Sequence, residues 1–461
     1  MTAPSHDAPL YPPTVRGPAQ PLPVWRFLPT FVRNPLRALP QGVFEQPMVV
    51  AARRKAPIAW VTDPVLIERI LLDEHASFPK PPLEKRVLGP ALGDGILTAQ
   101  GASWRWQRRV ATPLFRHQDL LQLIPAMSDA ARLQIARWQA APAGAIRPIE
   151  RDMTDVTYDV VTRTLFAGAA ADEGDRIKAA SEELLDVITW EIAVSLLQAP
   201  AWLWHPGRGR MRRNSALMRR IVGQIVARCR TELPGSRPNG GLIARMLSAR
   251  DPDTGEPMTD DQIVDNLLTF LLAGHETTAK ALTWALYLMA RVPAWQERVR
   301  AEVSAAAGTD PITAWHLDQL PVTTRVLKEA LRLYPPAPIM TRLVSADTVL
   351  GACELRAGTV LVLPIYAIHR HRKLWADPDR FEPDRFLPER EAGHVRTQFM
   401  PFGFGPRTCI GMSFAMIEAT VLLATLVRDA RFGWDGRTSP EPVSRITLRP
   451  RGGMPLSVSV V

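Results

Sequence analysis

Cys409 stands in a loop whose residues suit a metal-bound thiolate. The chain has three cysteines, Cys229, Cys353 and Cys409, and no CxxC pair, so neither a disulfide framework nor a structural zinc site is indicated. Residues 402–411 read Phe-Gly-Phe-Gly-Pro-Arg-Thr-Cys-Ile-Gly and run into a predicted helix over 410–427. The glycines let backbone N–H groups approach a sulfur, and the positive end of the helix favours the thiolate. Taken alone, such a cysteine is more often a small buried side chain.

A polar interruption occurs in the middle of the longest predicted helix. The capping-box pattern Thr-Asp-Asp-Gln at Thr259 predicts its start, and apolar periodicity continues through Met289 until Pro293, which gives a rod of about 50 Å. Its centre reads Ala-Gly-His-Glu-Thr-Thr over 273–278, and such residues cost stability unless they have a role. Adjacent carboxyl and hydroxyl groups could carry protons into a buried site. A threonine bonded to its own i−4 carbonyl in a kinked helix is the alternative, and both can hold together.

A third pattern combines opposite charges on one helix. Glu329 and Arg332 share a face of a helix that Pro321 can start and that ends before Tyr334. On a surface such a pair is worth only a few tenths of a kcal/mol. Alone, this pattern is weak and is typical of a solvated face.

Taken together, these segments resemble the cytochrome P-450 family of haem-thiolate monooxygenases. The resemblance runs from about residue 43 to the carboxyl end, with the motifs in the family's order, and it is specific at Phe402, Gly405, Arg407, Cys409 and Gly411. It implies a mostly α fold with small β-sheets, in which haem b is buried between the long central helix and the cysteine loop. Cys409 is then the axial ligand of the haem iron, and Phe402 also contacts the haem.

The resemblance gives the polar interruption a catalytic meaning. In the family this stretch lies over the haem. The small Ala273 and Gly274 would leave room for dioxygen, the co-substrate, and Glu276 with Thr277 would form an acid–alcohol pair that supplies protons.

The resemblance also implies a structural role for the pair of Glu329 and Arg332. Arg385, in the downstream segment Phe-Glu-Pro-Asp-Arg-Phe, is expected to complete a buried network with Glu329 and Arg332. That network would brace the loop that carries Cys409, so its role is structural and not catalytic.

Haem propionates require cations or hydrogen-bond donors, and arginine binds carboxylates in bidentate fashion. Trp104 and Arg108 fit the family's WxxxR helix, and Arg342 and Arg407 complete the expected set. A plain surface position remains open for Arg108, which has equally basic neighbours. His369 is a weaker candidate, for which core packing is as good an interpretation.

The remaining chain predicts one large domain after a proline-rich lead-in. Residues 1–24 have repeated prolines and no signal-peptide pattern, so we expect a poorly ordered lead-in, followed by a single haem-thiolate domain over 25–461. Short strands are predicted near 48–50, 58–61 and 359–363, and helical periodicity dominates from 64 to 300. Loops are predicted at 79–95, 141–148 and 234–241.

Hydropathy and net charge indicate where the protein is located and which partners it binds. No run of about 18 apolar residues occurs, so no membrane anchor is expected, and we expect a cytoplasmic monomer. The formal net charge is +10, carried mainly by arginine, yet no nucleic-acid-binding motif accompanies it. A generic basic surface is one explanation. The other is an acidic ferredoxin or flavodoxin docking on an arginine-rich face at Arg105, Arg108, Arg109 and Arg116.

The function predicted from the sequence is oxidation of a lipophilic molecule. The absence of a dinucleotide fingerprint within the chain indicates that electrons from NAD(P)H come through separate redox proteins. The candidate pocket segments at 79–98, 339–340 and 452–454, with the helix positions Leu272, Ala273 and Thr277, are largely apolar and favour hydroxylation or epoxidation of a fatty acid, terpenoid or steroid. The alternatives are a peroxide-driven or isomerising haem-thiolate enzyme, against which Glu276 and Thr277 argue, and a catalytically silent haem- or ligand-binding protein.

Overall fold

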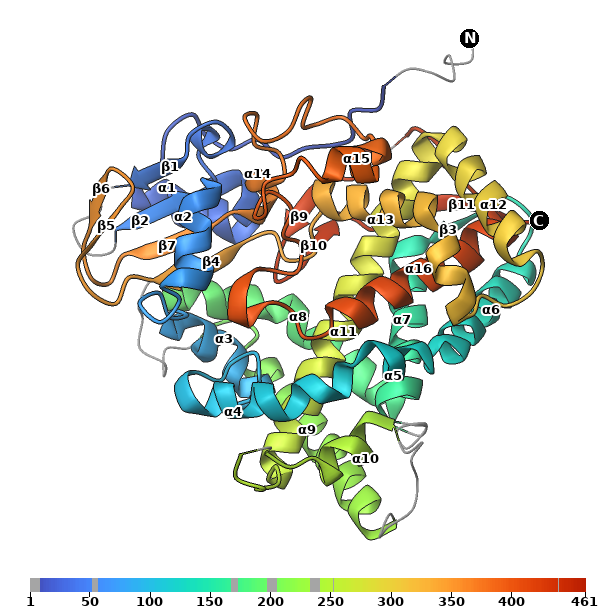
Figure 1. The fold of residues 1–461 in the computed structure, drawn as a ribbon, viewed down its shortest axis with the longest axis horizontal. Helices are drawn as coiled ribbons and strands as arrows, with labels where there is room; N and C mark the ends of the chain where they lie inside the picture. Colours follow the sequence, from blue (N-terminus) through green and yellow to red (C-terminus); the bar gives the residue numbers. More distant parts are fainter. Residues whose placement is uncertain are drawn as a thin grey trace. The chain divides into compact units, whose positions relative to one another are not determined.

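The computed structural model describes residues 9–51, 57–166, 173–196, 205–232, 241–251, 253–437 and 439–461. The fold is mostly helical with small β-sheets, as predicted (Figure 1). The chain divides into two compact units. The first unit comprises Met1–Pro79, Met127–Val156 and Thr277–Val461, and the second unit comprises Lys80–Ala126 and Thr157–Glu276. Among the described residues, no helix combines the length and the apolar character needed to span a membrane.

The strands among the described residues belong to the first unit. The largest sheet has the order β1-β2-β7-β4, with β2 and β7 parallel and the other neighbours antiparallel. The strands predicted near 48–50, 58–61 and 359–363 are confirmed as members of this sheet. Its strands are β1 (Met48–Ala51), β2 (Ile58–Val61), β4 (Met340–Leu343) and β7 (Val360–Leu363). The smaller sheets contain β3 (Ala145–Pro148), β5 (Thr348–Leu350), β6 (Cys353–Leu355), β8 (Ala430–Gly433), β9 (Pro442–Ser444), β10 (Leu448–Pro450) and β11 (Pro455–Val460).

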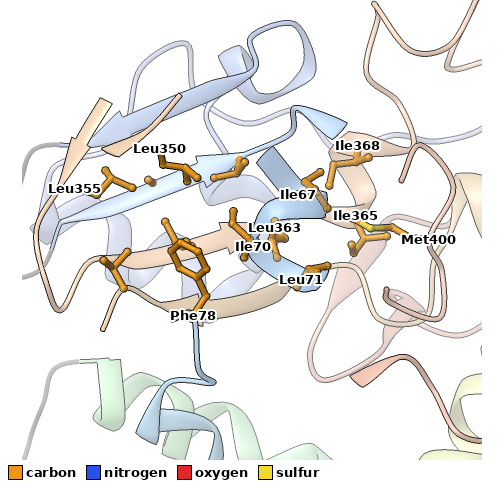
Figure 2. Packing of buried hydrophobic residues seen from close by; sticks show 14 residues of the cluster. Ile67, Ile70, Leu71, Phe78, Leu350, Leu355, Leu363, Ile365, Ile368 and Met400 are labelled. Carbon is orange, nitrogen blue, oxygen red and sulfur yellow. The ribbon is translucent and has the colours of Figure 1, made fainter. Parts of the chain in front are cut away.

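A hydrophobic core packs against the β1-β2-β7-β4 sheet (Figure 2). Alternate residues of β7, Leu361 and Leu363, are fully buried because side chains of a strand alternate between its two faces. Met400, which precedes the cysteine loop, belongs to the same cluster. The labelled members in Figure 2 are Ile67, Ile70, Leu71, Phe78, Leu350, Leu355, Leu363, Ile365, Ile368 and Met400.

Each unit has its own helices. Those of the first unit are α1 (Val24–Arg33), α2 (Pro64–Glu68), α12 (Pro293–Ala307), α13 (Pro321–Leu333), α14 (Ile365–Ile368), α15 (Pro388–Glu391) and α16 (Met412–Asp429). Those of the second unit are α3 (Pro82–Leu92), α4 (Gly101–Ala111), α5 (His117–Leu121), α8 (Gly174–Leu196), α9 (Arg208–Glu232) and α10 (Gly241–Ser248). Residues of both units occur in α6 (Ile124–Gln139), α7 (Ile149–Leu165) and α11 (Asp260–Arg291).

The two helices that carry sequence motifs begin and end as predicted. At the start of α11, the Thr259 N–H donates to Gln262 Oε1 at 2.9 Å and the Gln262 N–H donates to Thr259 Oγ1 at 3.2 Å, which is the predicted capping box. Pro293 lies just beyond its end at Arg291. Helix α13 starts at Pro321 and ends before Tyr334. Proline suits the first turn of a helix because the missing N–H has no helical acceptor there.

The predicted loop at 79–95 contains a helix. Helix α3 runs from Pro82 to Leu92, so the prediction is wrong for most of that segment. The prolines suggested a loop, but Pro82 occupies the first helical turn, where it is tolerated. Likewise the predicted loop at 141–148 ends in β3, whose pairing with β11 no local pattern could reveal. The predicted loop at 234–241 lies outside the described residues except for Gly241, which opens α10.

The structure corrects the prediction of a poorly ordered lead-in for residues 9–23. Leu10 and Val15 are buried. The Leu10 carbonyl accepts a hydrogen bond from Phe381 N at 2.9 Å, and the Val15 N–H donates to the Tyr366 hydroxyl at 3.0 Å. Proline removes donors but keeps its carbonyl, so a proline-rich segment can still be held by donors from elsewhere in the fold. Residues 1–8 lie outside the described part of the chain.

Candidate active site

The backbone holds the loop that carries Cys409. The Cys409 N–H donates to the Phe402 carbonyl at 2.9 Å, and the Gly403 N–H donates to the Met400 carbonyl at 3.0 Å. Gly403 and Gly405 both adopt a φ of +75°, a conformation that side chains disfavour. The loop therefore closes on itself at Phe402, and the Cys409 side chain is exposed.

Glycines place this loop close to its neighbours. A Cβ on Gly405 would overlap the carbonyl oxygen of Leu71, in the π-helical turn η3 (Arg69–Asp73), so no larger residue fits. A Cβ on Gly411 would lie 4.0 Å from the Cys409 sulfur. Because Gly411 is the N-cap of α16, the sulfur lies beside the positive end of that helix, which favours a thiolate. The helix starts at Met412, two residues later than predicted, because Gly411 caps it.

His369 forms a hydrogen bond with the backbone just before the cysteine loop. It is fully buried, and its Nε2 accepts a hydrogen bond from the Met400 N–H at 3.0 Å. Burial, together with the nearby charge of Arg332, lowers the pKa of His369 to about 3, so the imidazole is neutral. Of the two interpretations of this residue, core packing is the one that the structure favours.

The predicted network of Glu329, Arg332 and Arg385 is confirmed. Arg332 and Glu329 are fully buried and form a bidentate pair at 2.7 and 2.8 Å. Arg385 Nε lies 3.6 Å from Glu329 Oε1, and Arg332 also donates to the His369 carbonyl at 2.8 Å. Because His369 in turn binds Met400, a continuous set of hydrogen bonds joins the charged network to the start of the cysteine loop.

The acid–alcohol pair lies near the middle of α11. Glu276 is 6% exposed, whereas Thr277 is half-buried. Ala273, three residues before Glu276, is exposed, and Gly274 is so close to α7 that a Cβ would lie 3.3 Å from Val161 Cγ2. Ala273, Gly274 and Thr277 are thus accessible in the middle of a mostly buried helix.

Sequence reasoning missed one acid, Glu418 in α16. It is fully buried, and neither carboxyl oxygen has a hydrogen-bond partner among the described residues. Burial raises the pKa of Glu418 to about 8, so the carboxyl is neutral at pH 7. The nearby hydroxyl of Thr278 in α11 opposes part of this shift. The available signal was one acid within the apolar run that follows Cys409.

The candidate propionate-binding residues come from three elements. Trp104 and Arg108 lie one turn apart on α4, and Trp104 is buried while Arg108 is partly buried. Arg342 in β4 is buried, and its Nη1 donates to the Thr341 carbonyl at 2.8 Å. Arg407, in the short 3₁₀ helix η7 (Gly405–Arg407), is partly buried. Trp104 and Arg108 belong to the second unit, and Arg342 and Arg407 belong to the first unit.

Of the arginines predicted to bind an acidic partner, Arg109 is already engaged. Its guanidinium forms ion pairs with Asp251 at 2.9 Å and with Asp253 at 2.7 Å. The Asp251 side chain is fully buried. Arg105 and Arg116 are exposed. The Arg109 side chain is nevertheless 46% exposed, and its charge compensates a buried acid within the second unit.

The cysteine loop suits a metal ion whose other ligands come mostly from a bound cofactor and not from protein side chains. Among the described residues, no group of three or more His, Cys, Asp and Glu side chains could hold a metal ion. Cys409 instead offers a single exposed sulfur at a helix start. One thiolate suffices for haem iron, because the porphyrin supplies four nitrogen ligands. The helical fold, the braced loop and the interrupted helix together define a haem-thiolate protein.

The comparisons with known proteins agree with this class. The cytochrome P450 family profile matches residues 18–455, and the chain belongs to this family. Cyclooctatin synthase of Streptomyces melanosporofaciens is 31% identical over 92% of this chain and 90% of that protein. Human cytochrome P450 4F12 is 32% identical over 88% of this chain and 82% of that protein.

A solved structure shows the same fold. The crystal structure of the cytochrome P450DA heme domain matches with a TM-score of 0.79 and 26% identity, covering 90% of each chain. The protein is therefore a cytochrome P450 monooxygenase, an oxidoreductase that uses haem b as its cofactor and dioxygen as its co-substrate.

Proposed function

We propose that this P450 hydroxylates or epoxidises a lipophilic molecule such as a fatty acid, terpenoid or steroid. One observation carries the proposal: apart from the hydroxyl of Thr277, the accessible residues at the predicted pocket positions of α11 and at the start of β4 are apolar. Ala273 is exposed, and Leu272, Ile339 and Met340 are half-buried. Apolar walls of this kind bind ligands through burial of apolar surface and leave few polar groups to orient them.

The site residues keep the roles that their motifs imply. Cys409 would ligate the haem iron through its thiolate, with Phe402 beside the cofactor. Trp104, Arg108, Arg342 and Arg407 would bind the propionates. When bound, the haem supplies the iron chemistry that activates dioxygen. Ala273 and Gly274 would leave space for dioxygen.

Glu276 and Thr277 would deliver protons to the active site. A carboxyl group that is 6% exposed, next to a more accessible hydroxyl on the same helix, can pass a proton from the interior toward the reacting oxygen. The alternative enzyme, driven by peroxide, does not need this delivery.

The cysteine assignment has a direct spectroscopic test. The reduced carbon monoxide complex of the protein is expected to show the strongly red-shifted Soret band of a thiolate ligand. Cys409→His should abolish the shift, because imidazole donates less charge to the iron than thiolate does. Cys353→Ser is a matched control that should leave the band unchanged. A red-shifted band in Cys409→His would contradict the assignment.

The substrate and the electron source can be tested together. A lipophilic library is screened for the low-to-high-spin optical shift, and hits are incubated with NAD(P)H and a ferredoxin or flavodoxin system, or with peroxide alone. An oxidised product only with the redox proteins supports the proposal. Product with peroxide alone supports the peroxide-driven enzyme, and binding without product supports a silent binding protein.

The extent of the domain, its oligomeric state, its location and its redox partner are also proposals. We infer that residues 25–461 work as one haem-thiolate domain, as a cytoplasmic monomer that receives electrons from an acidic ferredoxin or flavodoxin. The net charge of +10 and the exposed Arg105 and Arg116 support an acidic partner.

A further inference from the structure

Helix α2 and the π-helical turn η3 follow each other directly and form one short helical stretch, residues 64–73, which we call the 64–73 segment. At its end the Glu74 N–H donates to the Arg69 carbonyl, five residues back, at 2.9 Å, which is the π-helical pattern. Its fully buried side chains share one hydrophobic core with Met400, and they are Ile67, Ile70 and Leu71 (Figure 2). Because buried apolar contacts oppose local opening, the 64–73 segment is a firmly packed part of the first unit.

Thr397 attaches the chain that leads to the cysteine loop to this segment. Thr397 is 1% exposed, and its hydroxyl donates to the Pro64 carbonyl at 3.1 Å. Three residues later, the Met400 N–H donates to His369 Nε2 at 3.0 Å. The start of the cysteine loop is therefore held from two sides, by His369 and by the 64–73 segment.

A second contact between the same parts of the chain lies at the surface. Arg396 Nη1 lies 3.0 Å from Glu68 Oε1, and the Arg396 guanidinium lies 4.9 Å from the centre of the Phe404 ring. The Arg396 side chain is 66% exposed. Because water weakens an exposed ion pair and an exposed cation–π contact, the buried Thr397 is the stronger attachment.

The 64–73 segment also contacts the cysteine loop itself. A Cβ on Gly405 would overlap the Leu71 carbonyl oxygen, so the two backbones touch there. Gly405 precedes Cys409 by four residues. It lies within the turn that the hydrogen bond from the Cys409 N–H to the Phe402 carbonyl closes. A displacement of the loop from the 64–73 segment therefore moves the backbone beside Cys409.

We propose that Thr397 is a positioning residue that holds the cysteine loop against the 64–73 segment and thereby sets how strongly the Cys409 thiolate donates to the haem iron. The donor strength of a thiolate depends on the backbone N–H groups and the helix end beside its sulfur, so a small shift of the loop changes it. The loop and its partners named above all belong to the first unit. The proposal rests on the proposed function, because it takes Cys409 as the iron ligand.

The experiment uses the haem-loaded protein and three variants. Thr397→Val removes the hydroxyl and changes neither shape nor charge, whereas Thr397→Ser keeps the hydroxyl. Thr359→Val is the matched control, because Thr359 is also fully buried and its hydroxyl donates to a backbone carbonyl, that of Arg356, at 2.7 Å. Each valine variant loses one hydrogen bond of the same kind, so we expect similar decreases in the thermal midpoint.

The first readout is amide hydrogen exchange in residues 400–409. We expect about fivefold faster exchange in Thr397→Val, because the loop opens more readily once its attachment to Pro64 is lost. Exchange in Thr397→Ser and Thr359→Val should match the wild type.

The second readout is the reduction potential of the haem iron, measured by spectral titration with a reductant. We expect a lower potential in Thr397→Val, because N–H groups that stabilise the thiolate would lie farther from the sulfur. Since this substitution changes no charge, the shift would report the geometry of the loop. Thr397→Ser should restore the wild-type potential, and Thr359→Val should not change it. A merely structural hydrogen bond would lower the thermal midpoint and leave the potential unchanged.

Two results would overturn the proposal. Exchange in residues 400–409 that is the same in Thr397→Val and Thr359→Val means that Thr397 does not hold the loop. Faster exchange with the wild-type potential means that the attachment does not set the donor strength of the thiolate. Failure of the Cys409 assignment looks different, because Cys409→His would then keep the red-shifted carbon monoxide band.

Discussion

Two buried acids of the first unit, Glu329 and Glu418, differ in what surrounds them. Glu329 accepts two hydrogen bonds from Arg332 and one from the Glu382 N–H at 2.8 Å. Glu418 has no hydrogen-bond partner among the described residues, and burial raises its pKa to about 8. Glu329 thus lies in an ion pair with a guanidinium, whereas Glu418 is buried without such a partner among the described residues.

We expect Glu418 to make the stability of the protein depend on pH. Between its ordinary pKa of 4.5 and the folded value of about 8, the folded state holds a proton that the unfolded state has lost. The free energy of unfolding therefore falls as pH rises through this range, by about 1.4 kcal/mol per pH unit. Above pH 8 this contribution levels off.

Urea unfolding of the wild type and Glu418→Gln at pH 5 to 9 measures this effect. The difference between the two proteins should grow with pH and then become constant. The exposed Glu389, changed to Gln, serves as the control and should follow the wild type. Parallel curves for wild type and Glu418→Gln would show that Glu418 is ionised in the folded protein.

At the scale of elements, α13 contributes one buried and one surface ion pair. Arg332 and Glu329 are fully buried. Lys328, the neighbour of Glu329, pairs with Glu391 at 2.6 Å, and these side chains are 27% and 36% exposed. The two pairs allow the energetic value of burial to be compared on a single helix.

Glu329→Gln is expected to destabilise the protein by about 3–5 kcal/mol, because Arg332 would keep a buried charge without its partner. Glu391→Gln should cost at most about 1 kcal/mol, since water replaces the lost contact. Chemical unfolding measures both values. Because His369 links the network to Met400, Glu329→Gln should also weaken the thiolate carbon monoxide band during mild heating. Equal costs for the two variants would contradict the structural role.

At the scale of the whole molecule, the positive charge is only partly available to a partner. The formal net charge is +10. Arg105 and Arg109 on α4 are both exposed, but Arg109 also forms ion pairs with Asp251 and Asp253. Net charge from composition therefore counts groups that the fold has already neutralised.

Arg105→Gln should slow reduction by an acidic ferredoxin several-fold at low ionic strength, and the difference should fade as salt screens the attraction. Arg109→Gln should also lower the free energy of unfolding, because the carboxylate of Asp251 would lose an ion-pair partner. Stopped-flow reduction and chemical unfolding separate the two effects. The exposed Arg356 is the control site. Reduction by Arg105→Gln at the wild-type rate in low salt would exclude Arg105 from docking.

The sequence by itself determined the elements that local patterns specify. The capping box at Thr259, the prolines at Pro293 and Pro321, and the glycines around Cys409 act within a few residues, so α11, α13 and the cysteine loop were predictable. The family motifs extended this prediction to the network of Glu329, which the structure confirms.

Tertiary structure alone decided the contacts between segments far apart in the chain. Met400 contacts His369, Asp94 contacts Asp265, and Phe381 contacts Leu10, and each pair is separated by 31 residues or more. No local pattern encodes such pairs, because they form only when packing brings the segments together. Burial also sets the pKa of Glu418, so its neutral state depends on the folded environment and not on its neighbours in sequence.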